Sequence, residues 1–270
     1  MTITFVGGGN MATALIGGLA KQGVAPNTIR VVEVIAEQRA WLQQQLGVVA
    51  FATVAEALPG SDVVVLAVKP QQLREAVTAM APHIGEAVVL SIAAGTRLVD
   101  IGRWLGRPRK LVRCMPNTPA LIGLGVSAIF APSDVTKTER DAVERILRAA
   151  GTVVWVDHEA LLDPVTAVSG SGPAYVFYFL EAMQQAASEM GLAPETGRIL
   201  AMETFRGAAE LALRSNDPPE LLRARVTSKG GTTAAAIASM DHDGLKTAIV
   251  RALAAANTRA RELADEAGKD

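Results

Sequence analysis

The segment Phe5-Val-Gly-Gly-Gly-Asn-Met-Ala12 decides the fold of this 270-residue chain. It follows an apolar stretch, residues 2–6, that predicts a buried strand, and it begins a pattern, residues 10–22, that predicts a helix. Its spacing, Gly7-x-Gly9-x-x-Ala12, is typical of the tight turn that brings backbone close to a dinucleotide pyrophosphate. A glycine triplet alone is weak evidence, but the flanking strand and helix support the same interpretation.

Strands and helices alternate along the first 157 residues. Apolar, β-branched segments predict strands buried on both faces, and the patterns between them predict helices. Strands are expected at 2–6, 30–33, 63–68, 88–92, 110–115, 125–130 and 152–156, and helices at 10–22, 36–46, 71–80, 98–105 and 137–150. This alternation gives right-handed crossovers and a mostly parallel sheet. We therefore predict an α/β, Rossmann-type domain over residues 1–157.

The strand pattern stops after residue 157. Helices are expected at 161–168, 173–190, 194–214, 219–226, 233–240 and 245–267. Their faces are rich in small residues such as Ala248, Ala252 and Ala255, which leave this part of the chain a thin core of its own. We predict that residues 158–270 form an all-α C-terminal dimerisation domain, through which two copies pair.

Composition excludes several classes of partner. Lys+Arg 26 against Asp+Glu 27 leave a net charge of −1, without the basic face that nucleic acids or anionic membranes attract. No apolar run approaches the roughly 18 residues of a membrane span, and the N-terminus has no signal-peptide pattern. The single cysteine, Cys114, is interpreted as a small buried hydrophobe and suits a reducing compartment. We expect a cytoplasmic protein with no metal site.

Several polar or small segments follow predicted strands, where ligands of open α/β sheets bind. Lys69-Pro70 follows one strand, Ser91-Ile-Ala-Ala-Gly95 the next, and Met115-Pro-Asn-Thr-Pro119 the one after. Lys69 is either a crevice lysine or a solvated residue before a helix-starting proline. The expected cofactor contacts are Val6, Gly7, Gly8, Gly9, Asn10, Met11, Glu33, Ala67, Val68, Lys69, Pro70, Ala93, Ala94, Gly95 and Asn117.

Glu33 bears on the choice of coenzyme. It ends the second predicted strand, about 20 residues beyond the glycine segment, where an acidic side chain accepts the ribose hydroxyls of NADH. The alternative is a solvated glutamate at the end of a strand. Arg39 is near enough in sequence to reach the 2′-phosphate of NADPH, or it is a surface charge of the helix. The sequence leaves the coenzyme open.

A second glycine-bearing turn, Val226-Thr-Ser-Lys-Gly-Gly-Thr-Thr233, lies between two predicted helices. Free backbone N–H groups at a helix N-terminus favour a small anion. An ordinary helix cap is the alternative. Ser169-Gly-Ser-Gly-Pro173, a predicted loop of small residues, is either a helix break or part of a site wall.

These segments together resemble pyrroline-5-carboxylate reductases over essentially the whole chain. The matching stretches are Val6-Gly-Gly-Gly-Asn-Met-Ala12, Ala67-Val-Lys-Pro70, Ser91–Gly95, Met115-Pro-Asn-Thr-Pro-Ala120, Val168-Ser-Gly-Ser-Gly-Pro-Ala-Tyr-Val176 and the turn from Val226 to Thr233. The resemblance implies a Rossmann domain, a helical domain interlocked with its dimer mate, and often rings of dimers. It also implies reduction of 1-pyrroline-5-carboxylate to L-proline by NAD(P)H, the last step of proline biosynthesis.

Two residues depart from the family pattern. Lys229 replaces a common proline, and Glu33 stands where many relatives carry an uncharged residue suited to NADPH. The expected substrate-binding residues are Ser228, Gly230, Gly231, Thr232, Thr233 and Ser171, and the expected catalytic residues are Thr233 and Lys69. Thr233 is expected to place its hydroxyl nearest the ring nitrogen.

The histidines bear on whether the substrate is an imine or a ketone. A ketone needs a nearby acid for its alkoxide, but His83, His158 and His242 lie in no pattern with an orienting carboxylate. Lys69 could also supply the acid for a ketone, so reduction of a ketone stays an alternative. A β-hydroxy acid dehydrogenase would carry a lysine that residues 157–189 lack. A dinucleotide sensor would not need the turn at 226–233.

Overall fold

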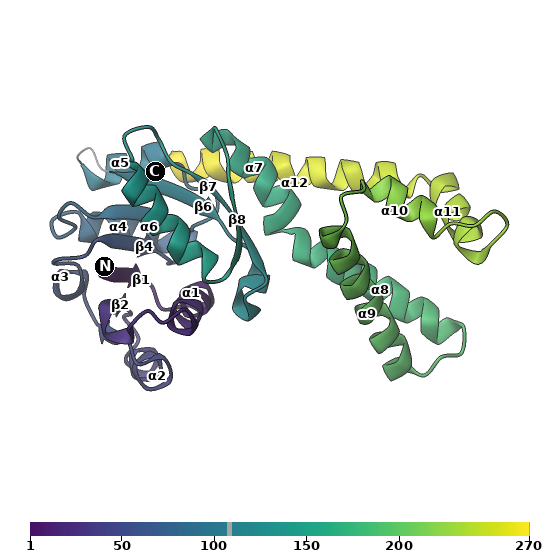
Figure 1. Cartoon of the computed structure of the whole chain (residues 1–270). Helices are drawn as coiled ribbons and strands as arrows, with labels where there is room; N and C mark the ends of the chain where they lie inside the picture. The colour runs from purple at the N-terminus through teal and green to yellow at the C-terminus, as the bar shows by residue number, and fades with distance from the viewer. Residues whose placement is uncertain (107–109, 270) are drawn as a thin grey trace. The chain divides into compact units, whose positions relative to one another are not determined.

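One sheet organises the first part of the chain. The structure is a computed structural model that describes residues 1–106 and 110–269. Across these residues, eight strands form a sheet in the order β3-β2-β1-β4-β5-β6-β7-β8, with only the β6–β7 pair antiparallel (Figure 1). The strands are β1 (Ile3–Val6), β2 (Ile29–Val32), β3 (Val49–Phe51), β4 (Val63–Leu66), β5 (Val88–Ser91), β6 (Leu111–Met115), β7 (Gly125–Phe130) and β8 (Gly151–Trp155). The order 3-2-1-4-5-6 is that of a dinucleotide-binding Rossmann fold.

Helices cover both faces of this sheet. They are α1 (Asn10–Lys21), α2 (Ala36–Leu46), α3 (Val54–Ala57), α4 (Pro70–Met80), α5 (Leu98–Leu105), α6 (Lys137–Arg148) and α7 (Leu162–Val165). Short 3-10 turns occupy η1 (Pro26–Thr28), η2 (Thr118–Ile122) and η3 (Glu159–Leu161). Sequence features set several starts: Pro70 begins α4, and Thr136 with Glu139 forms a capping box for α6.

The core lies in two layers, one on each face of the sheet. On one face Phe5 packs with Leu15 and Ile146, and on the other Leu66 packs with Leu73. These side chains are fully buried, and burial stabilises the fold by about 1.5–3 kcal/mol for each large apolar side chain. Because successive residues of a strand point to opposite faces, β4 supplies both layers, as its unbroken apolar sequence predicts.

Two short elements are not predicted from the sequence. β3 has three residues and α3 has four, too few for an apolar period to show. The expected strand at 63–68 is also shorter, since β4 ends at Leu66. Residues 67–69 therefore form a connection between β4 and α4. The buried thiol of Cys114 matches its interpretation as a small hydrophobe, and burial raises its pKa to about 12.

The prediction of a loop at 169–173 is wrong. A π-helical turn, η4 (Thr166–Gly170), continues α7 instead. Gly170 packs closely on Met115, since a methyl group there would lie 2.5 Å from Cε of Met115 and that side chain would have to move. The hydroxyls of Thr166 and Ser169 donate to carbonyl oxygens four residues earlier, which supports helical backbone here.

The remaining helices are α8 (Gly172–Glu189), α9 (Pro194–Arg214), α10 (Pro219–Arg225), α11 (Thr232–His242) and α12 (Leu245–Gly268). α8 and α9 pack closely where Gly197 faces Ala187. Most large apolar side chains here are exposed, including Phe177, Tyr178 and Leu213. The thin core predicted from the sequence is therefore present. No helix in the described residues combines the length and apolar character that crossing a bilayer requires.

The chain divides into two compact units, Met1–Ser171 with Ala256–Asp270, and Gly172–Ala255. This division differs from the boundary expected after residue 157. The cause is packing: α7 contacts β6 and β7, and the last turns of α12 contact the segment before α5. Periodicity marks where strands give way to helices, whereas the compact unit follows tertiary contacts.

Candidate functional site

The glycine segment fits between the ends of β2 and β4. Gly7 has a φ of 104°, its N–H donates to the carbonyl of Val32, and a methyl group there would lie 2.9 Å from backbone atoms of Ala67 and Val68. The left-handed φ and the close approach both require glycine at this position. Ala12, fully buried, lets α1 pack against the sheet.

The backbone around Gly9 is open. A methyl group at Gly9 would meet no atom within 4 Å, and Gly9 is the N-cap of α1 without a side-chain hydrogen bond to the cap. The first turn of a helix has N–H groups without intrahelical partners, and its dipole favours an anion. The residues Gly9, Asn10 and Met11 thus fit a pyrophosphate, as the sequence predicts.

Glu33 is bound to the glycine segment. One carboxylate oxygen accepts the N–H of Gly8 at 3.2 Å, and the other accepts the N–H of Ile35 at 3.0 Å. Arg39 donates to the carbonyl oxygen of Glu33 at 2.7 Å. Gln38 donates to the carbonyl oxygen of Gly8 at 3.1 Å, a contact that no sequence signal indicated. The end of β2 and the glycine segment therefore form one hydrogen-bonded structure.

The segments after β4 and β5 lie at the same carboxyl edge of the sheet. Lys69 is the exposed N-cap residue of α4, and Pro70 is the first residue of that helix. After β5, the buried side chain of Ala93 packs in the second core layer, and Gly95 has a φ of 73°. A methyl group at Gly95 would lie 3.5 Å from Cβ of Leu263, so the end of α12 covers this turn.

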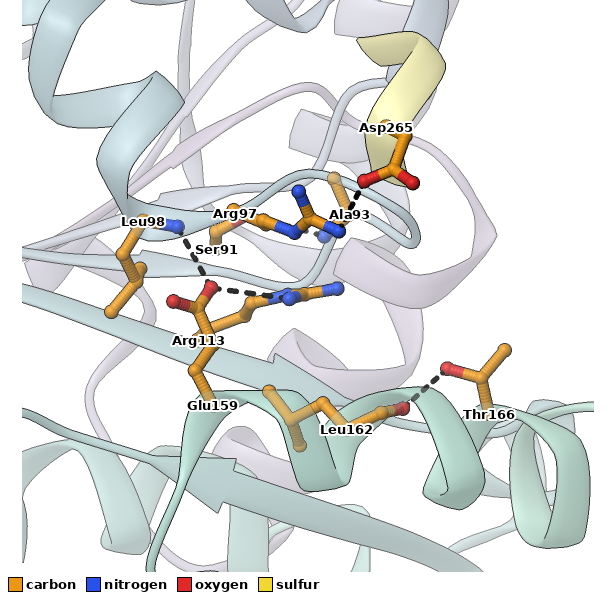
Figure 2. Close-up of polar contacts among 9 residues, drawn as sticks. All are labelled: Ser91, Ala93, Arg97, Leu98, Arg113, Glu159, Leu162, Thr166 and Asp265. Carbon is orange, nitrogen blue, oxygen red and sulfur yellow. Dashed lines mark hydrogen bonds and ion pairs between the residues drawn. The ribbon is translucent and has the colours of Figure 1, made fainter. Parts of the chain in front are cut away.

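Charged residues hold the start of α5, as Figure 2 shows. Arg97 donates to Asp265 of α12 at 2.6 Å. Glu159 accepts the N–H of Leu98 at 2.8 Å and a hydrogen bond from Arg113 at 3.1 Å. Arg113 is buried in β6, with 4% of its surface exposed. Sequence reasoning missed Arg113 and Glu159 because nothing in their spacing, 46 residues apart, relates them.

Asn117 lies where the sequence placed it, after β6, but its amide is already engaged. Its Nδ2 donates to the carbonyl of Ser169 at 3.1 Å, and its Oδ1 accepts the N–H of Val126 at 2.9 Å. The side chain is buried, so it fastens the loop after β6 to η4 and β7. A contact with the nicotinamide or substrate stays a prediction, for which the second Nδ2 hydrogen and the second lone pair of Oδ1 are left.

The turn at 226–233 belongs to the second unit. Gly230 has a φ of 73°, and Gly231 is the N-cap of α11 without a side-chain hydrogen bond to the cap. α11 begins at Thr232, one residue earlier than expected, so Thr232 and Thr233 both lie in its first turn. Their N–H groups are therefore available to an anion, as predicted. Ser228, Gly230 and Thr232 are exposed.

The other candidates are placed as follows. Ser171 follows η4 and is half-buried at the end of the first unit. His158 and His242 are exposed, and His83 is half-buried, which agrees with the surface or structural roles expected of them. Residues 1–106 and 110–269 contain no group of three or more histidine, cysteine, aspartate or glutamate side chains arranged to hold a metal.

The strand order, the glycine turn and the uncapped start of α1 define a dinucleotide-dependent oxidoreductase with a Rossmann-type domain. Comparison with known proteins narrows this class. Residues 2–95 match the family model "NADP oxidoreductase coenzyme F420-dependent", and residues 159–263 match "Pyrroline-5-carboxylate reductase dimerisation". The chain belongs to the pyrroline-5-carboxylate reductase family.

The relatives match along their full length. Pyrroline-5-carboxylate reductase of Pseudomonas aeruginosa is 45% identical over 99% of this chain and 98% of its own. The structure of the Coxiella burnetii pyrroline-5-carboxylate reductase superposes with a TM-score of 0.92 at 39% identity, covering 97% of this chain and 98% of that one. The Plasmodium falciparum enzyme with NADP bound gives 0.87 at 26% identity, covering 98% of each chain.

Proposed function

We propose that this chain reduces the C=N bond of 1-pyrroline-5-carboxylate to give L-proline, with NADPH or NADH as the hydride donor. The observation that carries the proposal is a second candidate anion site, in addition to the glycine segment: the uncapped start of α11, which follows Gly230 and Gly231. A protein that bound only a dinucleotide would not need it. Similarity to pyrroline-5-carboxylate reductases over the whole chain supports the same reaction, the last step of proline biosynthesis.

Reduction of this C=N bond requires correct positioning of the substrate more than it requires a strong acid. When bound, NAD(P)H supplies a hydride to the imine carbon. The π electrons of the C=N bond move to nitrogen, which carries the proton of the product amine. Because a protonated imine already has the positive charge that attracts hydride, the residues of this chain need mainly to hold and orient the ring. The absence of a histidine pattern for ketone reduction agrees with this requirement.

The turn at 226–233 is proposed to bind the substrate carboxylate. Backbone N–H groups and hydroxyls of Ser228, Gly230, Gly231, Thr232 and Thr233 supply donors at the positive end of the α11 dipole. Thr233 is assigned the hydroxyl nearest the ring nitrogen, which donates to it directly or through a water. Thr233 is a half-buried residue in the first turn of α11.

The first unit is proposed to bind the coenzyme. Val6, Gly7, Gly8, Gly9, Asn10, Met11, Glu33, Ala67, Val68, Lys69, Pro70, Ala93, Ala94, Gly95 and Asn117 line the carboxyl edge of its sheet or fasten that edge. Lys69, exposed at the start of α4, is the proposed second catalytic residue, and Ser171 a substrate contact.

We propose a homodimer joined through the C-terminal helices, with dimers assembling into rings in the cytoplasm. The match of residues 159–263 to a dimerisation family supports pairing. The exposed side chains of Phe177, Tyr178 and Leu213 give the second unit apolar surface to bury. Sedimentation velocity tests this: a single monomeric species would rule the dimer out, and a species larger than a dimer would support the ring.

The activity is tested by mixing the protein with 1-pyrroline-5-carboxylate and either NADPH or NADH. We expect the absorbance of the reduced nicotinamide to fall with at least one coenzyme, and L-proline to accumulate in equal amount. A β-hydroxy acid with oxidised coenzyme serves as the control substrate. Turnover of that control, without turnover of the imine, would indicate a β-hydroxy acid dehydrogenase instead.

A further inference from the structure

The carboxylate of Glu33 is fixed at the end of β2. Its two oxygens accept the N–H groups of Gly8 and Ile35, at 3.2 and 3.0 Å. A carboxylate held by two backbone donors on different segments cannot rotate away without losing hydrogen bonds to both. The carboxylate is therefore held in a fixed place beside the glycine segment.

This position is where a dinucleotide places its adenosine ribose. In a Rossmann fold the pyrophosphate lies at the start of the first helix, and the ribose lies beside the end of the second strand. Glu33 directly follows β2, and its carboxylate contacts Gly8 inside the glycine turn. A carboxylate has about four lone-pair sites. Two are used by Gly8 and Ile35, so two are left for ribose hydroxyls.

The start of α2 is the other place where a 2′-phosphate would be stabilised. Ile35 is the N-cap of α2, with no side-chain hydrogen bond to the cap, and such an N-terminus ordinarily attracts an anion. Here the N–H of Ile35 is already donated to Glu33. One donor at this helix start is thus taken by the chain's own carboxylate, which also places a negative charge there.

The nearest cation in sequence is Arg39, which is held at the end of the same strand. Arg39 donates through Nη1 to the backbone carbonyl of Glu33 at 2.7 Å, which ties its guanidinium to the strand end. Between Glu33 and Arg39 the chain carries no lysine or arginine, and Val34 and Ile35 are exposed apolar residues. Such side chains suit the adenine face and provide no phosphate ligand.

We propose that Glu33 makes this chain select NADH over NADPH, by accepting the ribose hydroxyls and repelling a 2′-phosphate. The inference rests on the proposed function for the identity of the bound coenzyme. Two negative charges a few ångströms apart at a half-exposed site repel each other, and solvent and salt screen only a part of this repulsion. We expect NADPH to bind at least about tenfold more weakly than NADH, which corresponds to about 1.4 kcal/mol.

Equilibrium binding tests the proposal without turnover. The dissociation constants of NADH and NADPH are measured by nicotinamide fluorescence on the whole protein, for the wild type and for Glu33→Gln. The variant is expected to bring the two constants together, within about threefold, mainly by tightening NADPH. Glu75→Gln is the matched control, because Glu75 is an exposed carboxylate in the middle of α4, outside the glycine segment and the start of α2. The control should leave the ratio of the constants unchanged.

A second measurement needs no variant, so it holds even if Glu33→Gln does not fold. ADP-ribose and its 2′-phosphorylated form are compared on the wild-type protein alone, where Glu33 predicts that the phosphorylated ligand binds at least about tenfold more weakly. Equal or tighter binding of the phosphorylated ligand, or NADPH affinity that falls in Arg39→Gln while NADH affinity stays, would overturn the proposal. Those results would leave the proposed reaction standing. If neither coenzyme binds, the proposed function fails and the inference with it.

Discussion

Asn117 donates its side-chain amide to the carbonyl oxygen of Ser169 across 3.1 Å, joining the loop after β6 to the π-helical turn η4. The residue four positions after Ser169 is Pro173, which has no N–H, so the Ser169 carbonyl lacks the usual helical donor and can accept from a side chain. The same amide accepts the N–H of Val126 on β7. One buried side chain therefore fixes three segments at the point where the first unit ends.

Replacement of Asn117 by alanine should destabilise the protein. Two backbone groups, the carbonyl of Ser169 and the N–H of Val126, would lose their partners in a buried place. The expected loss is about 1–3 kcal/mol in the free energy of unfolding, measured by urea titration. Thr118→Ala, at the exposed next position, is the control and should stay within about 0.5 kcal/mol of the wild type. An Asn117→Ala variant as stable as its control would mean that the amide does not hold the loop.

Replacement of Gly7 by alanine should impair both stability and coenzyme binding. The added methyl group would lie 2.9 Å from the backbone of Ala67, and the φ of 104° is strained for any other residue. We expect a loss of about 1–3 kcal/mol in unfolding free energy. Gly17→Ala is the matched control inside α1, where a methyl group meets nothing within 4 Å. It should raise stability by roughly 0.5–1 kcal/mol. Equal stability of the two variants would contradict the close packing of the glycine turn.

Loss of Glu159 should cost far more than loss of an exposed partner. Glu159→Ala leaves the guanidinium of Arg113 buried without its carboxylate and removes the acceptor of the Leu98 N–H. Removing one partner of a buried pair typically costs about 3–5 kcal/mol. The comparison is Glu195→Ala, which breaks an exposed pair with Arg198 and should cost at most about 1 kcal/mol. The free energy of unfolding of both variants is measured by chemical denaturation. Similar decreases in the two variants would show that the Arg113–Glu159 pair is not buried in solution.

Thr233→Ala should lower kcat while coenzyme affinity stays nearly unchanged. The hydroxyl is assigned to the ring nitrogen, and removing a donor of this kind typically costs about 10²-fold in rate. Ser239→Ala removes an exposed hydroxyl from the other end of α11 and should leave kcat as it is. Turnover at the wild-type rate in Thr233→Ala would take this residue out of the mechanism.

Much of the fold could be predicted from local sequence. The β-branched stretch at 63–66 and the glycine turn that follows Val6 set buried parallel strands and the strand–turn–helix. These features depend on neighbours in sequence, so periodicity and turn chemistry reveal them. β3 is the contrary case, because three residues become a strand only through pairing with β2.

The candidate site likewise contains some residues that local sequence reveals and others that it does not. Gly7, Gly9 and the start of α11 could be located because backbone conformation at a helix start depends on local residue types. Arg113 and Glu159 could not, since their pairing exists only after distant segments pack. The glycines and serines at 169–173 predict a loop because such residues usually break helices, whereas the π turn begins at Thr166 and continues to Gly170, which packs on Met115.

The most direct test of the account follows the hydride itself. NADH and NADPH carrying deuterium at the transferred position are mixed with the protein and 1-pyrroline-5-carboxylate, and the product is analysed by mass spectrometry. The account predicts L-proline with a single deuterium at the former imine carbon, from at least one of the two coenzymes. Absence of labelled proline with both coenzymes, from protein that is folded and binds a coenzyme, would contradict it.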